Sequence, residues 1–155
     1  MNERARQLIE TLALEPHPEG GWYRETWRRE SDAGPVGTAI YYLLAAGHCS
    51  RLHRLYADEV WHLYEGGPVV ISRLGARGPE PVRLEAAAPQ AVVPAGAWFG
   101  AELGPDVQYA LLGCTMAPGF EFDRFEPGER RELERDFPHC LETIRRLTPG
   151  PEGTA

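Results

Sequence analysis

The short β-type runs between Gly21 and about Met116 constrain the fold more than any other feature of this chain. Glycine or proline interrupts these runs every few residues. Many short strands separated by turn residues favour a β-sandwich or a β-barrel. The expected strands cover residues 22–29, 38–46, 51–56, 59–64, 69–74, 82–84, 91–93, 98–103 and 109–116.

Both ends of the chain have helical spacing instead. Apolar residues recur at intervals of three and four in residues 4–14, 129–137 and 140–147, which predicts one N-terminal helix and two short C-terminal helices. Pro16 ends the first helix and Pro138 separates the other two. A chain of 155 residues can bury a full core. We expect one domain over residues 1–148 and a flexible Pro/Gly-rich tail over residues 149–155.

The charge and composition exclude several classes of protein. The formal net charge is −7, whereas nucleic-acid binding depends on clustered basic residues that neutralise phosphates. The chain has no lysine, so it has neither a Schiff-base lysine nor the lysine of a phosphate-binding loop. We expect no nucleic-acid partner.

The three cysteines form no C-x-x-C pair, which is typical of reduced thiols in a reducing compartment. The first ten residues lack the apolar core of a signal peptide, and the longest apolar run is too short to span a membrane. These features predict a cytoplasmic protein without a membrane partner.

A regular spacing of glycine, histidine and glutamate extends from Gly47 to Gly66. His53 follows Gly47 after five residues, Glu59 follows after five more, and Gly66 follows after another six. This spacing resembles the first motif of the cupin superfamily, except that Leu55 stands where that motif has its second histidine. The resemblance implies that one metal ligand is replaced here.

A second segment resembles the second cupin motif. Pro94 and Gly96 have the expected spacing, but Ala88 replaces its leading glycine, Phe99 its histidine and Leu103 its asparagine. Two of the four usual metal ligands are therefore replaced by side chains without a lone pair. We expect no cofactor. The alternative is a weak site for Fe, Mn, Ni or Zn, formed by His53, Glu59 and water.

His53 and Glu59 can also be interpreted without a metal. They can form a buried polar pair that holds the barrel together, because buried charges persist when they are paired. Such a pair in an apolar cavity would have shifted pKa values, which permits acid-base chemistry. His62 has the opposite strand parity to Glu59 and is expected on the outer face with Val60 and Tyr64. This outer stripe predicts a homodimer or a covering helix.

Aromatic residues gather in the same motifs. Trp61 shares the face of Glu59, Trp98 and Phe99 follow the second glycine, and either Tyr41 or Tyr42 must face inward. A concave site lined by aromatic residues with a few polar groups is typical of a small-molecule pocket. Ordinary core packing is the alternative for each of these residues.

The loop at residues 16–26 is the third candidate region. Two prolines and two glycines frame it, and Glu19, Tyr23, Arg24 and Glu25 lie in it. Rigidly framed loops often carry functional residues. The alternative is a turn that seats the N-terminal helix, with Arg24 and Glu25 in surface ion pairs.

Five segments, taken in order, resemble the DUF985 or cupin 5 family over about residues 6–148. They are HPEGGWYRET, GTAIYYLL, HRLYADEVWHLYEGG, VPAGAWF and DFPHCLETIRRLT. The resemblance implies an all-β fold, a double-stranded β-helix jelly-roll or cupin barrel, and a dimer formed through its sheets. The related cupins with defined metal-free chemistry are the deoxysugar epimerases, which use a histidine and an acidic partner to move a proton beside a carbonyl group.

The leading hypothesis is a barrel that binds a small polar organic ligand, such as a sugar or nucleotide-sugar. If it is an enzyme, His53 acts as base or acid, Glu59 orients it or shares its proton, and Arg24 stabilises an oxyanion. Tyr23, Glu25, Tyr41, Trp61, Trp98 and Phe99 are the expected ligand contacts. The alternatives are a metal-dependent isomerase or oxygenase and a non-catalytic ligand sensor.

Overall fold

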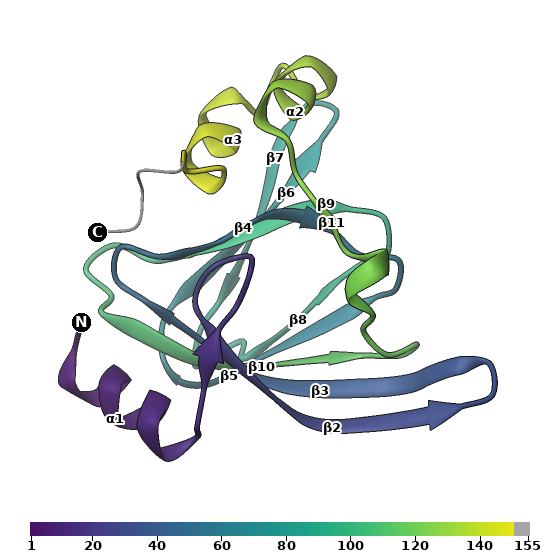
Figure 1. Ribbon diagram of the computed structural model, residues 1–155. Helices are drawn as coiled ribbons and strands as arrows, with labels where there is room; N and C mark the ends of the chain where they lie inside the picture. The colour runs from purple at the N-terminus through teal and green to yellow at the C-terminus, as the bar shows by residue number, and fades with distance from the viewer. Residues whose placement is uncertain (151–155) are drawn as a thin grey trace.

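Two antiparallel sheets face each other in the computed structural model, which describes residues 1–150 (Figure 1). The first sheet has six strands in the order β1-β2-β3-β10-β5-β8. Its strands are β1 (Glu15–Pro16), β2 (Trp22–Ser31), β3 (Gly34–Ala45), β10 (Tyr109–Met116), β5 (Glu59–Gly66) and β8 (Gln90–Val93). Strands distant in sequence pair directly, as in β3 with β10 and β10 with β5.

The second sheet has five strands in the order β11-β4-β9-β6-β7. These are β11 (Glu126–Pro127), β4 (Cys49–Arg54), β9 (Trp98–Leu103), β6 (Val69–Gly75) and β7 (Gly78–Leu84). From β3 to β11 the chain crosses to the other sheet after every strand except β6, which is followed by β7 in the same sheet. This alternation confirms the predicted jelly-roll.

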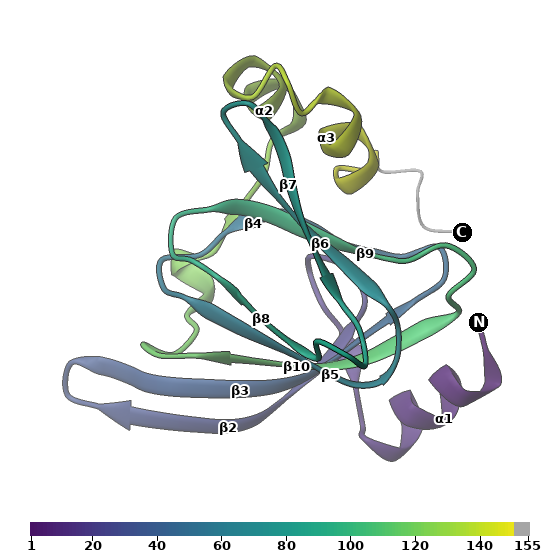
Figure 2. The ribbon, with the colours of Figure 1, turned by 180° about the vertical axis from the view of Figure 1, so that it is seen from behind.

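Three α-helices cover the outside of the barrel, at opposite ends of the molecule (Figure 2). Helix α1 (Glu3–Thr11) packs Ala5 and Leu8 against the outer face of the six-stranded sheet. Helices α2 (Arg130–Asp136) and α3 (Leu141–Leu147) pack on the five-stranded sheet through Leu133, Ile144 and Leu147. None of these helices is long and apolar enough to cross a membrane.

The main core fills the space between the sheets. Trp61, Tyr42 and Phe99 are its largest side chains that are almost fully buried, and they all point inward from their strands. The three glycines of the cupin-like motifs have left-handed backbones, with φ of 86° at Gly47, 76° at Gly66 and 78° at Gly96. Glycine adopts this conformation without steric cost, so all three positions favour it.

The predicted elements agree with the structure except at their ends. Two strands have the expected bounds, Trp98–Leu103 and Tyr109–Met116, whereas β3 begins four residues earlier than expected, at Gly34 instead of Thr38. The extra residues pair with the end of β2 and form a hairpin that projects beyond the barrel (Figure 1). Residues 151–155 of the expected tail lie outside the described residues.

Candidate functional site

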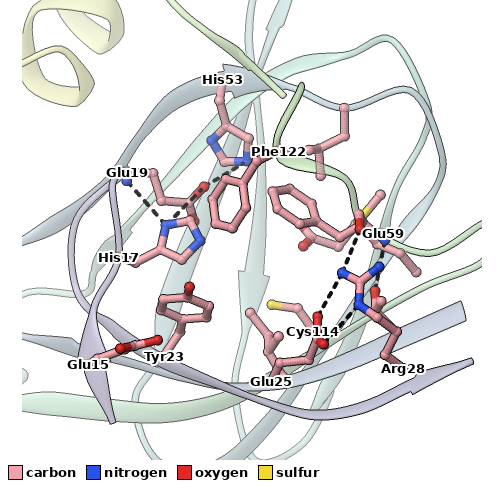
Figure 3. A pocket seen from close by; sticks show the side chains of 15 residues that line it. Glu15, His17, Glu19, Tyr23, Glu25, Arg28, His53, Glu59, Cys114 and Phe122 are labelled. Carbon is pink, nitrogen blue, oxygen red and sulfur yellow. Dashed lines mark hydrogen bonds and ion pairs between the residues drawn. The ribbon is translucent and has the colours of Figure 1, made fainter. Parts of the chain in front are cut away.

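A cavity of about 280 Å³ lies at one end of the barrel, beside β2 and the loop before it (Figure 3). Its polar lining consists of Glu15, His17, Glu19, Tyr23, Glu25, Arg28, Thr38, His53 and Glu59. Its apolar lining consists of Ile40, Leu55, Cys114, Met116, Phe120 and Phe122. The cavity therefore brings His53, Glu59, Tyr23 and Glu25 together, four of the residues expected in the site.

His53 lies on β4 with a side chain that is only 2% exposed. Its ring packs on Phe99, with a centroid distance of 4.2 Å. Nδ1 lies 2.7 Å from the carbonyl oxygen of Arg51, and a carbonyl only accepts, so Nδ1 carries a proton. The second ring nitrogen, Nε2, is therefore left for acid-base chemistry.

The carboxylate nearest to His53 belongs to Glu19. Glu19 Oε2 lies 3.3 Å from His53 Nε2, and the Ser50 hydroxyl donates to Glu19 Oε1 at 3.0 Å. A lone pair on Nε2 would repel the carboxylate, so the contact is favourable when a proton lies on one of the two groups. His53 and Glu19 therefore act as a unit that holds one proton.

His17 completes this wall of the cavity. The backbone N–H of Glu19 donates to His17 Nδ1 at 3.2 Å, which holds the ring in the tautomer that is protonated on Nε2. Burial lowers the pKa of His17, and although the Glu19 charge opposes this effect, the result is still a lowered value. His17 is therefore a neutral hydrogen-bond donor near pH 7, and its ring meets Tyr23 edge-on at 4.5 Å.

Glu59 lies on β5 and is 8% exposed. The indole N–H of Trp61 donates to Glu59 Oε2 at 2.6 Å. Burial raises the pKa of Glu59 from 4.5 to about 8, and the charge of Glu19 adds to this effect. Glu59 is therefore a neutral carboxylic acid near pH 7. The predicted pairing of His53 with Glu59 is therefore wrong. His53 contacts Glu19 instead, and Glu59 accepts a hydrogen bond from Trp61.

The charged side chains of β2 differ in whether they face the cavity. Tyr23 and Glu25 line it, whereas Arg24 alternates to the other face and lies over the Tyr41 ring, 5.7 Å from its centroid. An irregularity in the pairing with β3 between Glu25 and Trp27 then changes the alternation, so that Arg28 faces the cavity. The prediction of Arg24 in this site is therefore corrected to Arg28.

Four predicted aromatic contacts do not line the cavity. Trp61 and Phe99 belong to the core beneath it, and Trp98 packs outside the barrel, 4.8 Å from the Arg54 guanidinium. Tyr41 packs on the outer face with the residues that contact helix α1. The inward tyrosine is Tyr42, whose hydroxyl donates to the Gly20 carbonyl at 2.8 Å.

The cavity also contains residues that sequence reasoning did not assign to the site. Glu15, His17 and Glu19 come from the chain before β2, and Phe120 and Phe122 come from the segment after β10. The Pro/Gly-framed loop gave a signal for Glu19 and its neighbours. Nothing in the local pattern marked the two phenylalanines, because irregular segments have no periodicity.

The resemblance to the cupin motifs raises the question of a bound metal. Leu55 lines the cavity and Phe99 packs beneath His53, at the two positions where ligands are replaced. Within residues 1–150 no three His, Cys, Asp or Glu side chains are placed to hold a metal ion. Leu55 and Phe99 offer no lone pair, so His53 Nε2 and Glu59 alone are an incomplete ligand set for a transition-metal centre.

Solved structures with similar folds fall into two groups. A protein from Shewanella oneidensis is 34% identical with a TM-score of 0.84, and the match covers 94% of this chain and 97% of that one. A hypothetical protein from Leishmania major is 28% identical with the same TM-score, covering 94% and 99%. The formate complex of oxalate decarboxylase from Lactobacillus farciminis is 19% identical with a TM-score of 0.58, covering 90% and 42%, which shows a shared fold.

No curated protein matches the chain. The family model described as "Cupin superfamily (DUF985)" matches residues 6–127, which is most of the sequence and includes both cupin-like motifs. The chain therefore belongs to the DUF985 family of the cupin superfamily.

Proposed function

We propose that this cupin binds a small polar organic ligand, such as a sugar, and moves a proton on it without a metal. The observation that carries the proposal is that two acid-base groups line one cavity: the His53–Glu19 unit, with its 3.3 Å contact, and the protonated Glu59. The cavity volume of about 280 Å³ is at the small end for ligand sites, which favours a single sugar or smaller molecule over a nucleotide-sugar.

The proposed reaction is a proton transfer beside a carbonyl group. His53 Nε2 removes a proton from the carbon next to the carbonyl when Glu19 holds the shared proton on Oε1, away from the ring. The C–H electron pair forms a C=C bond, and the carbonyl oxygen takes a proton from Glu59. His53 then returns a proton to the carbon while the enol O–H gives its proton back to Glu59 and the carbonyl re-forms, which gives exchange with solvent; a proton delivered by water on the opposite face gives epimerisation instead. An acid with a pKa of about 8 suits this work near neutral pH.

Glu59 is suited to the acid role by its hydrogen bonds. Trp61 donates to Oε2, which orients the carboxyl group. The hydrogen bonds of the described residues give the Glu59 proton no oxygen or nitrogen acceptor within the chain. A ligand carbonyl in the cavity supplies that acceptor.

The test is solvent exchange on a panel of aldoses and ketoses in D₂O, followed by NMR at the carbon beside the carbonyl. We expect exchange by the natural protein and a loss of at least about 100-fold in Glu59→Gln and in His53→Gln. Glu65→Gln is the matched control, because it removes an acid from the outer end of the same strand. Exchange at the natural rate in Glu59→Gln would contradict the mechanism, and binding without exchange would indicate a ligand sensor.

Two further predictions concern the whole protein: a cytoplasmic location and a homodimer. Tyr64 on the outer face of β5 remains 56% exposed beside Tyr41, so it is available to a second copy. Light scattering after size exclusion measures the mass, and a monomer at all concentrations would contradict the dimer.

A further inference from the structure

The charges that line the cavity limit which ligands it accepts. Arg28 is the one arginine among the lining residues within 1–150. Its guanidinium donates twice to Glu25, at 2.9 Å each, and once to Glu30 at 3.2 Å. It also donates to the Phe120 carbonyl at 2.8 Å. Two carboxylates therefore neutralise this cation, and most of its N–H groups are already used.

The other basic groups of the cavity do not supply a free positive charge. His17 is neutral near pH 7, because its Nδ1 accepts the Glu19 backbone N–H and burial disfavours its charged form. His53 and Glu19 hold one proton between them, so the unit has no net charge. Glu15 lines the cavity without an ion pair among the described residues. The lining as a whole is therefore negative.

The Tyr23 phenol lies next to these carboxylates. Burial raises the pKa of Tyr23, and the charges of Glu15 and Glu25 raise it further. An anion entering the cavity would meet the same two carboxylates that disfavour ionisation of Tyr23.

We propose that the ligand carries a positive charge, as a compact amine whose ammonium group lies beside Glu15 and the ring of Tyr23. This inference rests on the proposed function and specifies its ligand. An ammonium group donates hydrogen bonds to carboxylates and is attracted to aromatic faces. A phosphate or carboxylate ligand requires free arginine donors, and Arg28 has already committed its own. Nucleotide-sugars are therefore disfavoured by charge as well as by volume.

The experiment compares three pyranoses that differ in charge: glucosamine, glucose and glucuronate. Their affinities are measured by isothermal titration at pH 6.5, where Glu59 stays protonated. We expect glucosamine to bind about tenfold more tightly than glucose, and glucuronate to bind most weakly. The Glu15→Gln variant should lose the preference for glucosamine over glucose, and Glu65→Gln should retain it.

The outcomes separate this inference from the proposed function. Glucuronate binding as tightly as glucosamine would overturn the charge preference and leave sugar binding in place. An equal loss for all three sugars in Glu15→Gln would overturn the placement of the ammonium group. If none of the three binds, the proposed sugar site itself is wrong, and the charge preference falls with it.

Discussion

Each end of β5 carries a glutamate, but one is neutral and the other is an anion. Glu59 lies in the cavity, where burial raises its pKa to about 8. Glu65 lies on the outer face, where hydrogen bonds from Arg4 and Tyr109 lower its pKa to about 2. The difference teaches that access to water and the available partners decide whether a glutamate is an acid or an anion.

A change of register separates these two environments. Leu63 pairs with Leu112 and Glu65 with Leu111, so Tyr64 is an extra residue on β5. Strict alternation from Glu59 would place Glu65 inside the barrel. The bulge turns it outward, where it reaches Arg4 on helix α1 at 2.7 Å. Glu59 at the inner end is therefore protonated near pH 7, and Glu65 at the outer end forms an ion pair with helix α1.

The largest effect on stability is expected in Glu59→Gln, which replaces the titrating carboxylic acid of the cavity with an amide. The folded protein keeps the Glu59 proton that the unfolded chain releases above its ordinary pKa of 4.5. Rising pH therefore favours unfolding between pH 4.5 and about 8. Denaturant unfolding should show the variant and natural protein close at pH 4.5, and the variant more stable by a few kcal/mol above pH 8.

The difference between the two stability profiles isolates Glu59, because every other titrating group is shared. Parallel profiles from pH 4.5 to 9 would mean that Glu59 ionises normally and that the two ends of β5 do not differ. The acid role of Glu59 would then lose its support.

A smaller effect on stability is expected in Trp61→Phe, which removes the hydrogen-bond donor to Glu59. This change leaves Glu59 Oε2 without its 2.6 Å donor in a buried place. We expect a loss of about 1–3 kcal/mol in the free energy of unfolding. Trp27→Phe is the matched control, because Trp27 is 50% exposed on the β2–β3 hairpin. Equal losses in the two variants would show that the indole N–H contributes nothing specific.

Much of the fold could be predicted from the sequence because its signals are local. Alternating runs and turn residues marked the strands, and the spacing around His53, Glu59 and Gly96 marked the jelly-roll. The projecting part of the β2–β3 hairpin was missed because β2 is polar and exposed there, whereas β3 begins with Gly34, Pro35 and Gly37. Glycine and proline are depleted in strands and typical of turns, so this segment gives no strand signal.

The candidate site could be predicted only in part because bulges redirect side chains. Parity placed His62 outside β5, where its ring lies beside the exposed Tyr64. Parity cannot reveal the extra residue at Thr26, which turns Arg28 inward. The partnership of His53 with Glu19 joins residues 34 positions apart through the tertiary fold. Such a contact has no local signal.

The smallest effect is expected at the outer end, in Arg4→Ala. The ion pair with Glu65 is well formed, but the Arg4 side chain is 50% exposed, so water and salt screen it. The low pKa of Glu65 contributes stability above pH 4.5 that is lost as pH falls through about 2. Arg4→Ala should destabilise the protein less than Trp61→Phe does, and its effect should shrink in 1 M NaCl, whereas the effect of Trp61→Phe should not. A loss in Arg4→Ala that matches Trp61→Phe and persists in salt would mean that the outer end is as shielded from water as the inner one, and the contrast between the two glutamates would fail.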